Sequence, residues 1–425
     1  MDRELEGASE LIPRRVDAVV AESLSAFRVV VVHGARQVGK TTLARALVRR
    51  FGAVYVSLDE EDQRRAARED PRGFLEGIGT PLAIDEIQRV GEPLVLAIKV
   101  AVDSDTGPGR YLLTASTNFL TVPTISESLA GRVDIVTLWP LSMGELTGGS
   151  DGFVDRAFAG PEALATHPGA TLTRREYLEA VCRGGFPSVQ AMTERSRRRW
   201  FVRHVETVVQ REVVAAADVR RADGLTAMVR LLAANTGGEF VASRVADRLN
   251  LDRGTVNSYA PWLETVFLVH RSPAWRRNLT ARLVQRHKLY LADTGVAAAL
   301  VGKDADALAR PAEPATGALI ETFAVNEITK QLGWSDTWAR LHHLRDSDGA
   351  EIDVVLETPD GRVVGVEVKA STTPRPEDFR WLAMLRDRLD PLGDQFVCGV
   401  VLHTGPNRVT FGDRMIALPL ADLWT

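Results

Sequence analysis

The sequence predicts a multidomain α/β protein: a parallel sheet that carries a phosphate-binding loop, then a helical and winged-helix region, and finally a second α/β sheet domain. Three segments support this prediction: a glycine-rich loop at 34–41, a pair of short amphipathic helices within 242–269, and an amphipathic hairpin within 351–369. The chain has 425 residues, which is too long for one hydrophobic core and suggests about three domains. We place the predicted boundaries at 1–150, 151–222, 223–290 and 300–425.

Composition favours a globular protein in a reducing compartment. Apolar residues make up 45% and charged residues 25% of the chain, and the net charge of −4 means that nucleic acid would bind only at local basic patches. The two cysteines, Cys182 and Cys398, are too few for a disulfide framework. Apolar runs fall short of the roughly 20 residues that span a bilayer, and Met1 to Glu10 is acidic, unlike a signal peptide. We therefore expect a cytoplasmic protein without a membrane partner.

Residues 34–41 read Gly-Ala-Arg-Gln-Val-Gly-Lys-Thr and fit the G-x-x-x-x-G-K-T phosphate loop. The loop follows the apolar run 29–32 and precedes a helical stretch, so its backbone N–H groups and the helix N-terminus would face the phosphates. Lys40 would neutralise the β and γ phosphates, and the Thr41 hydroxyl would bind Mg²⁺. The residues that we expect to contact the nucleotide are Gly34, Ala35, Arg36, Gln37, Val38, Gly39, Lys40, Thr41, Thr42 and Asn118.

Short apolar segments alternate with helical ones through the first domain, which predicts a parallel sheet between layers of helices. The expected strands are 28–32, 54–58, 82–84, 111–114 and 135–138. The third strand ends in Asp85 and Glu86. We expect Asp85 to hold Mg²⁺ and Glu86 to act as the general base toward water, although such a pair also occurs where a strand merely enters a turn.

The fourth strand runs into Ser116, Thr117 and Asn118, and one of these polar side chains is expected to sense the γ-phosphate. The sequence contains no Asn-Lys-x-Asp motif, which reads guanine, so we expect ATP in preference to GTP.

The middle of the chain contains two basic segments. After a stretch rich in Gly, Ala and Pro at 151–170, interpreted as an interdomain connection, residues 196–203 combine four arginines with aromatic residues. This segment is either a solvated helix face or a contact for nucleic acid. Residues 270–288 carry six Arg or Lys residues, among them Arg276, Arg277 and Lys288, and no acid, and they are the strongest candidate for DNA contact.

Residues 242–269 have the pattern of a winged helix-turn-helix. One helix would bury Val245 and Ala246, and a second would follow Asp252 as its N-cap. The second helix would present Arg253, Thr255, Asn257 and Ser258 to a DNA groove. Pro261 lies within that helix, where it removes a backbone hydrogen bond and is expected to kink the helix. The alternative is that the two helices serve only to pack domains together.

The last domain contains a hairpin whose register follows from its turn. Thr358-Pro-Asp-Gly361 is a type I turn signal that pairs Thr358 with Arg362 and so sets Asp353 opposite Glu367, with Lys369 beside them. The opposite face is expected to carry Ile352, Val354, Leu356, Val364, Val366 and Val368. Asp, Glu-x-Lys is the constellation of restriction-type nucleases, in which the carboxylates hold Mg²⁺, or alternatively Mn²⁺, and the lysine acts on water. Glu321, from a helix upstream, is a further candidate metal ligand.

The order of the motifs resembles a known family. In chain order, the motifs resemble those of the prokaryotic AAA+-like ATPases that end in a domain of unknown function. They are the phosphate loop, Leu-Ala-Ile-Asp-Glu, Thr-Ala-Ser, Ser128-Leu-Ala-Gly-Arg132, Pro-Leu-Ser, Gly-Gly-Phe-Pro and Leu-Ala-Asp-Thr-Gly. The resemblance implies an extra strand between the phosphate-loop strand and the Asp85 strand. It also implies that Arg132 contacts the γ-phosphate, in the same subunit or in a neighbouring one of an oligomer. A surface ion pair is the alternative for Arg132. For the last domain the resemblance implies a restriction-endonuclease-like fold with Glu321, Asp353, Glu367 and Lys369 at its motif positions.

The sequence therefore predicts a protein that acts on DNA with ATP and Mg²⁺, hydrolyses ATP and carries a candidate metal-dependent nuclease domain. The alternative is a nucleotide-dependent switch or scaffold whose later domains bind partners without cutting anything.

Overall fold

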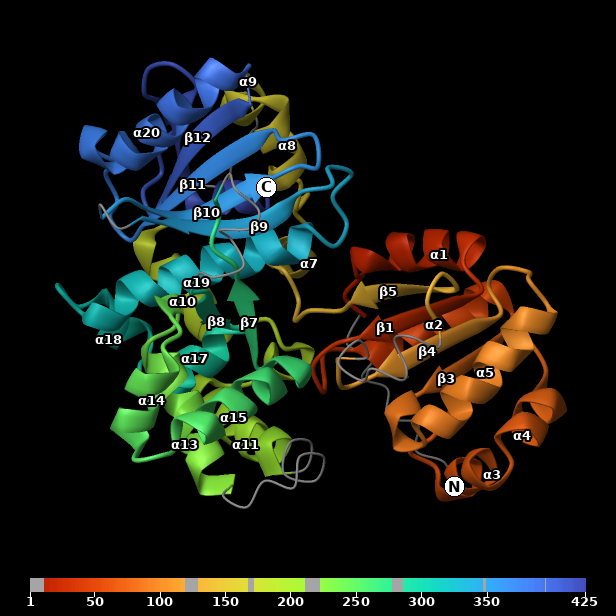
Figure 1. Cartoon of the computed structure of the whole chain (residues 1–425). Helices are drawn as coiled ribbons and strands as arrows, with labels where there is room; N and C mark the ends of the chain where they lie inside the picture. Colours follow the sequence, from red (N-terminus) through yellow and green to blue (C-terminus); the bar gives the residue numbers. More distant parts are fainter. Residues whose placement is uncertain are drawn as a thin grey trace.

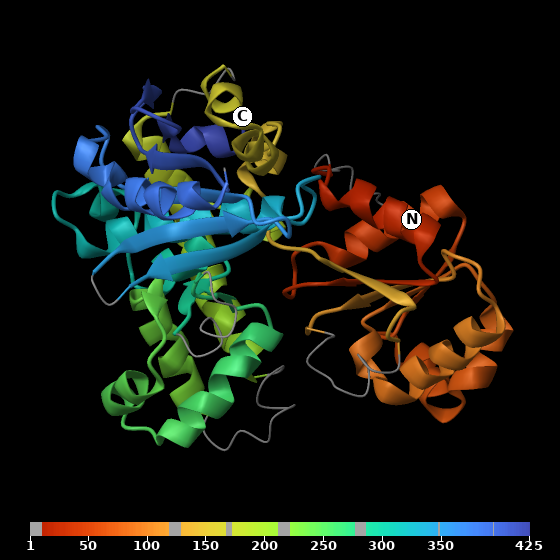
Figure 2. The ribbon, with the colours of Figure 1, turned by 45° about the horizontal axis from the view of Figure 1, so that its top comes forward.

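The computed structural model describes residues 11–118, 129–166, 172–210, 222–276, 286–346, 349–393 and 395–425. Residues 16–118 and 129–137 form an N-terminal lobe that stands beside a larger body made by the later described residues (Figures 1 and 2). In the part of the chain that the structure describes, no helix combines the length and apolar character needed to cross a membrane.

The N-terminal lobe is built on a parallel sheet, as predicted. Its strands stand in the order β2-β3-β4-β1-β5. Their bounds are β1 Val29–His33, β2 Val54–Ser57, β3 Leu82–Asp85, β4 Tyr111–Ala115 and β5 Val133–Thr137. Val29 pairs with Tyr111 on one side and with Val133 on the other. Strand β4 thus lies between β1 and β3, which is the extra strand that the family resemblance implies.

Helices cover both faces of this sheet, which explains why every residue of β1 is buried. Val30 and Val32 pack with Leu43 of α2, whereas Val29 and Val31 pack with Ile98 of α5 on the other face. The helices are α1 Val16–Ala26, α2 Lys40–Phe51, α3 Glu61–Glu69, α4 Pro71–Ile78 and α5 Glu92–Ser104, with a 3₁₀ turn η1 at Ile87–Arg89.

The middle of the chain contains helices and a small antiparallel sheet in the order β6-β8-β7. Its elements are α10 Arg174–Arg183, α11 Glu194–Val208, α13 Ala222–Ala234, β6 Gly238–Glu239, α14 Ala242–Leu249, α15 Arg253–Thr265, β7 Val269–Ser272, β8 Lys288–Leu291, α17 Thr294–Leu300 and α18 Ala305–Ala309. The predicted helix pair is confirmed: Asp252 caps α15 by accepting from Gly254 N at 2.7 Å, and Asn250 adopts the left-handed conformation between the helices. Helix α15 continues through Pro261.

The C-terminal sheet has the order β13-β14-β12-β11-β10-β9. Its strands are β9 Arg340–Arg345, β10 Glu351–Glu357, β11 Val363–Lys369, β12 Phe396–His403, β13 Val409–Thr410 and β14 Met415–Pro419. The predicted hairpin register is confirmed, because Val354 pairs with Val366 and Thr358 N donates to Arg362 O at 3.0 Å. The same register sets Asp353 opposite Glu367.

Helices cover both faces of the C-terminal sheet (Figures 1 and 2). Helix α19 Pro314–Gln331 packs on the face of Val354 and Val366, and α20 Arg380–Leu389 packs on the other. The prediction that Ile352 shares the face of Val354 is wrong: Ile352 packs with Leu382 on the α20 face. The register of β10 against β9 shifts between Ile352 and Val355, and such a bulge breaks the simple alternation of side chains.

The expected connection at 151–170 is wrong for its first part, which forms α8 Phe153–Ala159 and α9 Pro161–Ala165. Helix α8 packs on β12, where Cys398 Sγ donates to Ala157 O at 3.4 Å, and Arg156 Nη2 donates to Asp422 O at 2.7 Å. These short helices therefore cover the C-terminal sheet, because its apolar face needs a second layer. The remaining short elements are α7 Met143–Thr147, η3 Pro187–Val189, η5 Pro376–Phe379, η6 Asp390–Leu392 and η7 Leu420–Leu423.

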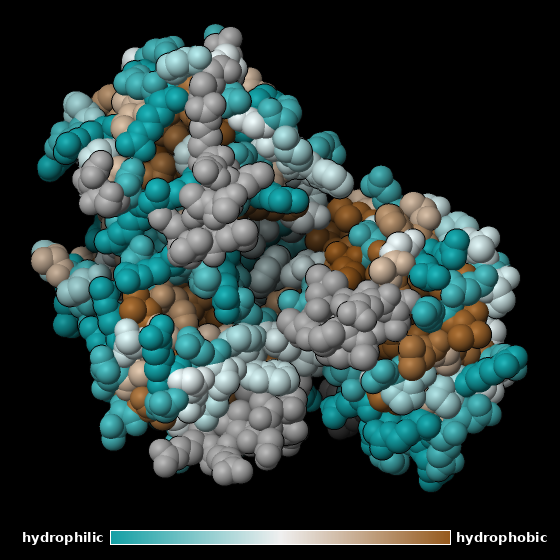
Figure 3. All heavy atoms as spheres, viewed as in Figure 1, coloured by the Kyte–Doolittle hydropathy of each residue, from teal (hydrophilic) through white to brown (hydrophobic). Residues whose placement is uncertain are grey.

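Hydrophilic side chains dominate the face drawn in Figure 3, but apolar surface gathers on the N-terminal lobe. Part of it lies over α5, where Leu96 and Val100 are exposed.

Candidate functional site

The loop between β1 and α2 needs its two glycines for different reasons. Gly39 adopts φ +104°, a left-handed conformation that side chains disfavour. A Cβ added to Gly34 would lie 2.1 Å from Leu138 O, so this position needs glycine because the backbone directly after β5 approaches closely. The loop then enters α2 at Lys40.

Lys40 is buried and points back into this loop. Its Nζ donates to Gly34 O at 3.0 Å and to Ala35 O at 2.9 Å. An ammonium group held by two carbonyls at a helix N-terminus lies beside the backbone N–H groups that bind phosphate in such loops.

Thr41 and Asp85 come together as predicted. Thr41 Oγ1 donates to Asp85 Oδ2 at 2.9 Å. The sequence did not indicate two further donors, since Tyr55 OH also donates to Asp85 Oδ2 at 2.9 Å, and Thr114 Oγ1 donates to Asp85 Oδ1. Both come from neighbouring strands, and they fix the orientation of this carboxylate.

Glu86 has φ +59° and is held by a residue that sequence reasoning missed. Gln88 Nε2 donates both to Glu86 Oε2 and to Ser116 Oγ, the latter at 2.7 Å. Glu86 N donates to Thr114 Oγ1 at 3.0 Å. The predicted general base and one predicted sensor residue are therefore joined through Gln88. The backbone N–H of Asn118 donates to Thr265 O at 2.6 Å, which ties the segment after β4 to the last residue of α15.

Arg132 follows β4 by a segment that includes residues 119–128, outside the described residues. Its side chain pairs with Asp103 of α5 and is partly exposed. The structure thus gives Arg132 a surface partner within the same chain.

A cavity of about 410 Å³ adjoins the loop. Thr42, Leu43 and Ala46 of α2 line it together with Ile12, Pro13 and Leu141. Arg14 closes one side, because its guanidinium donates to Val38 O at 2.8 Å and to Trp139 O at 2.7 Å and pairs with Glu145 at 3.0 Å. The sequence contains no motif that would have indicated this cavity.

Two histidines border the loop. His204 of α11 lies with Nδ1 3.3 Å from Gln37 Oε1, and its ring stacks on Trp200. Burial, followed by the charge of Arg36, lowers the His204 pKa to about 4. His33, directly before Gly34, also has its pKa lowered to about 4 by burial and then by Lys40.

The second predicted site is organised around a lysine. Lys288 Nζ lies 2.8 Å from Glu321 Oε1, 3.0 Å from Glu351 Oε1 and 3.3 Å from Asp353 Oδ1. We call Lys288 and these three acids the Lys288 cluster. Glu367 lies outside it and pairs with Lys369 at 2.6 Å. Glu367 Oε2 is buried without a hydrogen-bond partner.

Burial dominates the electrostatics of these acids. It raises the pKa of Glu321 to about 7 and that of Glu367 to about 8, and the charge of Asp353 adds to both shifts. Burial alone would lower the pKa of Lys288, but the surrounding anionic groups outweigh it and the pKa is raised.

The arrangement does not fit the metal site that the sequence predicts. Among the described residues, no group of three or more His, Cys, Asp or Glu side chains is arranged to hold a metal ion. Asp353 Oδ1 faces Lys288, and Asp353 Oδ2 accepts from Val368 N at 2.9 Å. Asp353 is therefore bound to an ammonium group and a backbone N–H, and Glu321 to the same ammonium group. Glu367 pairs with Lys369 through one oxygen only.

The prediction that Lys288 belongs to a free basic surface is wrong. Its side chain is only 2% exposed, because acids from α19 and β10 surround it. Arg271 pairs with Glu264, and Arg286 lies 3.7 Å from Glu239, so the fold supplies acids to a segment that has none of its own. Residues 277–285, including Arg277, lie outside the described residues. On α15, Arg253, Asn257 and Ser258 are exposed as predicted.

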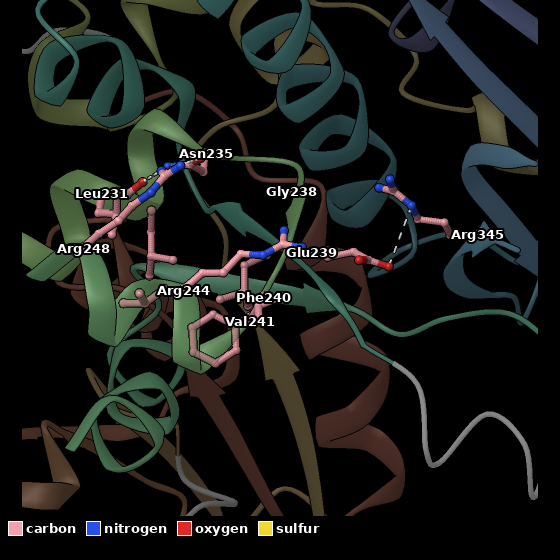
Figure 4. Close-up of a pocket in the computed structure, with 12 residues that line it drawn as sticks. Leu231, Asn235, Gly238, Glu239, Phe240, Val241, Arg244, Arg248 and Arg345 are labelled. Atoms are coloured by element: carbon pink, nitrogen blue, oxygen red, sulfur yellow. Dashed lines mark hydrogen bonds and ion pairs between the residues drawn. The ribbon is translucent and has the colours of Figure 1, made fainter. Parts of the chain in front are cut away.

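An arginine-lined pocket of about 300 Å³ lies beside α13, α14 and β6. Figure 4 shows Arg244 and Arg248 extending from α14, while Arg345 faces Glu239 from the C-terminal sheet at 3.9 Å. Arg248 Nη1 donates to Asn235 Oδ1 at 3.5 Å. No motif of the sequence indicates this pocket.

Comparisons with known proteins agree with the first site. Residues 26–147 match the sequence profile of the AAA domain; residues 174–307 and 316–423 match two domains of unknown function, DUF8612 and DUF4143. Uncharacterized proteins of Mycobacterium tuberculosis and Mycobacterium bovis are each 28% identical over 98% of this chain and 85% of their own. The Walker-type ATPase of Pyrococcus abyssi is 17% identical, with a TM-score of 0.41, over 70% of this chain and 98% of that one. The profile match identifies the N-terminal lobe as an AAA-like P-loop ATPase core.

Proposed function

We propose that the chain binds ATP with Mg²⁺ at the loop between β1 and α2 and hydrolyses it. The observation that carries the proposal is the contact of Thr41 Oγ1 with Asp85 Oδ2 at 2.9 Å, next to the buried Lys40. A hydroxyl at the start of α2 and a carboxylate at the end of β3 are the groups that hold Mg²⁺ in P-loop ATPases. When bound, Mg²⁺ would neutralise phosphate charge.

The other residues divide the remaining work. Lys40 would exchange the carbonyls of Gly34 and Ala35 for phosphate oxygens, and Glu86, oriented by Gln88, would accept a proton from water. The apolar cavity beside Thr42 suits the adenine ring. Arg132 would reach the γ-phosphate of its own or a neighbouring subunit after leaving Asp103.

Variants of the loop test this proposal. Lys40→Ala should weaken ATP binding in isothermal titration, whereas Glu86→Gln should bind ATP normally and release phosphate about 10²–10⁴ times more slowly, as expected for a lost general base. Glu60→Gln, at an exposed position, is the matched control and should keep its turnover. Normal turnover of Glu86→Gln would remove Glu86 from this role.

In the same phosphate-release assay, a change below about threefold for Arg132→Ala would assign Arg132 to its Asp103 pair, since arginine fingers contribute about 10³-fold or more.

DNA association is the second candidate function. The order α13, β6, α14, α15, β7, β8 is that of a winged helix, and α15 exposes Arg253 and Asn257. Asn257→Ala should change the sequence preference in a binding-site selection if α15 reads bases.

The double change Arg276→Ala with Arg277→Ala should lower the slope of log affinity for duplex DNA against log salt concentration by about one for each lost phosphate contact. A wild-type slope would move the contact elsewhere.

Metal-dependent DNA cleavage rests on one favourable observation, the register that sets Asp353 opposite Glu367, with Lys369 beside Glu367. Lys288 opposes it in the described arrangement. Incubating the protein with labelled duplex, single-stranded and branched DNA distinguishes cleavage from the switch or scaffold alternative. Each DNA form is tested with Mg²⁺ or Mn²⁺ and with or without ATP. Cleavage that disappears in Asp353→Ala would support the nuclease. If wild type cuts none of these DNA forms, the switch is the better account.

A further inference from the structure

Lys288 is the buried cation at the centre of the Lys288 cluster. It lies on β8, the central strand of the small sheet of the middle region, yet its three acidic partners come from α19 and β10. The side chain is 2% exposed, so water contributes little to its solvation. A buried ammonium is tolerated only when acids replace that water, and three acids do so here.

A second layer of ion pairs encloses the first. Arg345 lies 3.8 Å from Glu351 and 3.9 Å from Glu239, and Glu239 lies 3.7 Å from Arg286. Figure 4 shows Arg345 and Glu239 facing each other. Positive and negative groups therefore alternate from Arg286 to Lys288, which ties the β6-β8-β7 sheet to the C-terminal sheet.

The same contacts use the oxygens that a metal would need. Hard divalent cations require several carboxylate oxygens. Asp353 Oδ1 and Glu321 Oε1 face Lys288, Tyr290 OH also donates to Glu321 Oε1 at 2.8 Å, and Asp353 Oδ2 accepts from Val368 N. A divalent cation among these oxygens would also lie beside the ammonium group, and at such distances like charges repel strongly in a buried site.

We propose that Lys288 is the resident cation of this cluster: it holds the position that a divalent metal would take, and the chain binds no divalent cation there while β8 keeps this arrangement. The cluster then acts as an ion-pair lock between the middle region and the C-terminal sheet. The inference does not depend on ATP hydrolysis. It implies that DNA cleavage at Asp353 would first require Lys288 to leave.

Mn²⁺ binding to the nucleotide-free full chain, measured by titration calorimetry or electron paramagnetic resonance, tests the lock. Wild type and Asp353→Asn should bind Mn²⁺ equally, because the cluster contributes no site in either. Lys288→Ala should gain one Mn²⁺ per chain, and its melting temperature should rise on adding Mn²⁺. Asp353→Asn in the Lys288→Ala background should abolish both effects.

Two controls separate the lock from a general loss of positive charge. Lys303→Ala removes a lysine that pairs with Glu313 at 2.8 Å, and it should gain no Mn²⁺ site. Lys288→Arg keeps a cation and should gain none either. If Lys288→Ala does not fold, Lys288→Gln with Glu351→Gln, which removes one charge of each sign, replaces it. Asp353-dependent Mn²⁺ binding by wild type would overturn the proposal. A folded Lys288→Ala protein, or a folded Lys288→Gln with Glu351→Gln protein, that gains no Mn²⁺ site would overturn it too.

Discussion

Asp85 illustrates how single residues are fixed in this protein. It accepts hydrogen bonds from Thr41 of α2, Tyr55 of β2 and Thr114 of β4. The pairing of Thr41 with Asp85 could be predicted, because both belong to motifs with known roles. The hydrogen bond from Tyr55 to Asp85 could not be predicted, because it arises only from the strand order that sets β2 beside β3.

Lys288 shows the limit of counting charges along the chain. Residues 270–288 contain no acid, so the sequence suggested a free positive surface. Its partners Glu321, Glu351 and Asp353 are 33 or more residues away in sequence. Local charge predicts a binding surface only where tertiary structure does not bring acids to it.

Buried histidines should make stability depend on pH. Burial lowers the pKa of His204 to about 4, below its usual value of 6.5, so between these values the unfolded chain binds a proton that the folded chain does not. Acidification from pH 7 to 5 should therefore lower the melting temperature. The His204→Gln variant should lose less free energy of unfolding on acidification, by up to about 1.4 kcal/mol per pH unit for one proton. Scanning fluorimetry should show this as a smaller fall in its melting temperature. An unchanged pH dependence in this variant would mean that His204 takes up no proton on unfolding.

At the scale of elements, the motifs Gly-Gly-Phe-Pro and Leu-Ala-Asp-Thr-Gly contact each other within the middle region. The sequence matched them to a family without giving them a role. Asp293 caps α17 by accepting from Val296 N at 3.0 Å, and it also accepts from Gly185 N at 2.7 Å. A Cβ on Gly185 would lie 2.3 Å from Leu141 O, and one on Gly295 would lie 2.6 Å from Phe201. These glycines permit close packing, which residue patterns alone do not reveal.

Asp293→Ala should destabilise the protein more than an ordinary cap deletion. Loss of the cap costs about 1 kcal/mol, and leaving the buried Gly185 N–H without its acceptor adds about 1–3 kcal/mol. Asp304→Ala is the matched control, because Asp304 caps α18 through Ala307 N at 2.7 Å and its side chain makes no second hydrogen bond within the described part of the chain. Thermal unfolding should show the larger fall for Asp293→Ala. Equal falls would show that the bond to Gly185 contributes nothing.

At the scale of the whole molecule, aromatic rings connect the ATPase core to the Lys288 cluster. His33, directly before the phosphate loop, lies 5.0 Å from Phe267 between ring centroids, and Trp139 bridges Phe267 and His270. His270 stacks on Tyr290, whose hydroxyl donates to Glu321. The core and its loop could be predicted because their motifs are local. This connection could not, because it depends on how separate regions dock.

Phe267 should therefore carry coupling between nucleotide binding and the middle region, because packed side chains transmit structural shifts between sites. Hydrogen exchange with a non-hydrolysable ATP analogue and Mg²⁺ should show slower exchange in α2 and altered exchange in β7 and β8 of the wild type. Phe267→Leu should keep the effect in α2 and lose that in β7 and β8. Phe411→Leu, which removes a ring stacked on Phe379 in the C-terminal domain, should keep both. If Phe267→Leu also keeps both effects, coupling runs instead through the backbone contact of Asn118 with Thr265.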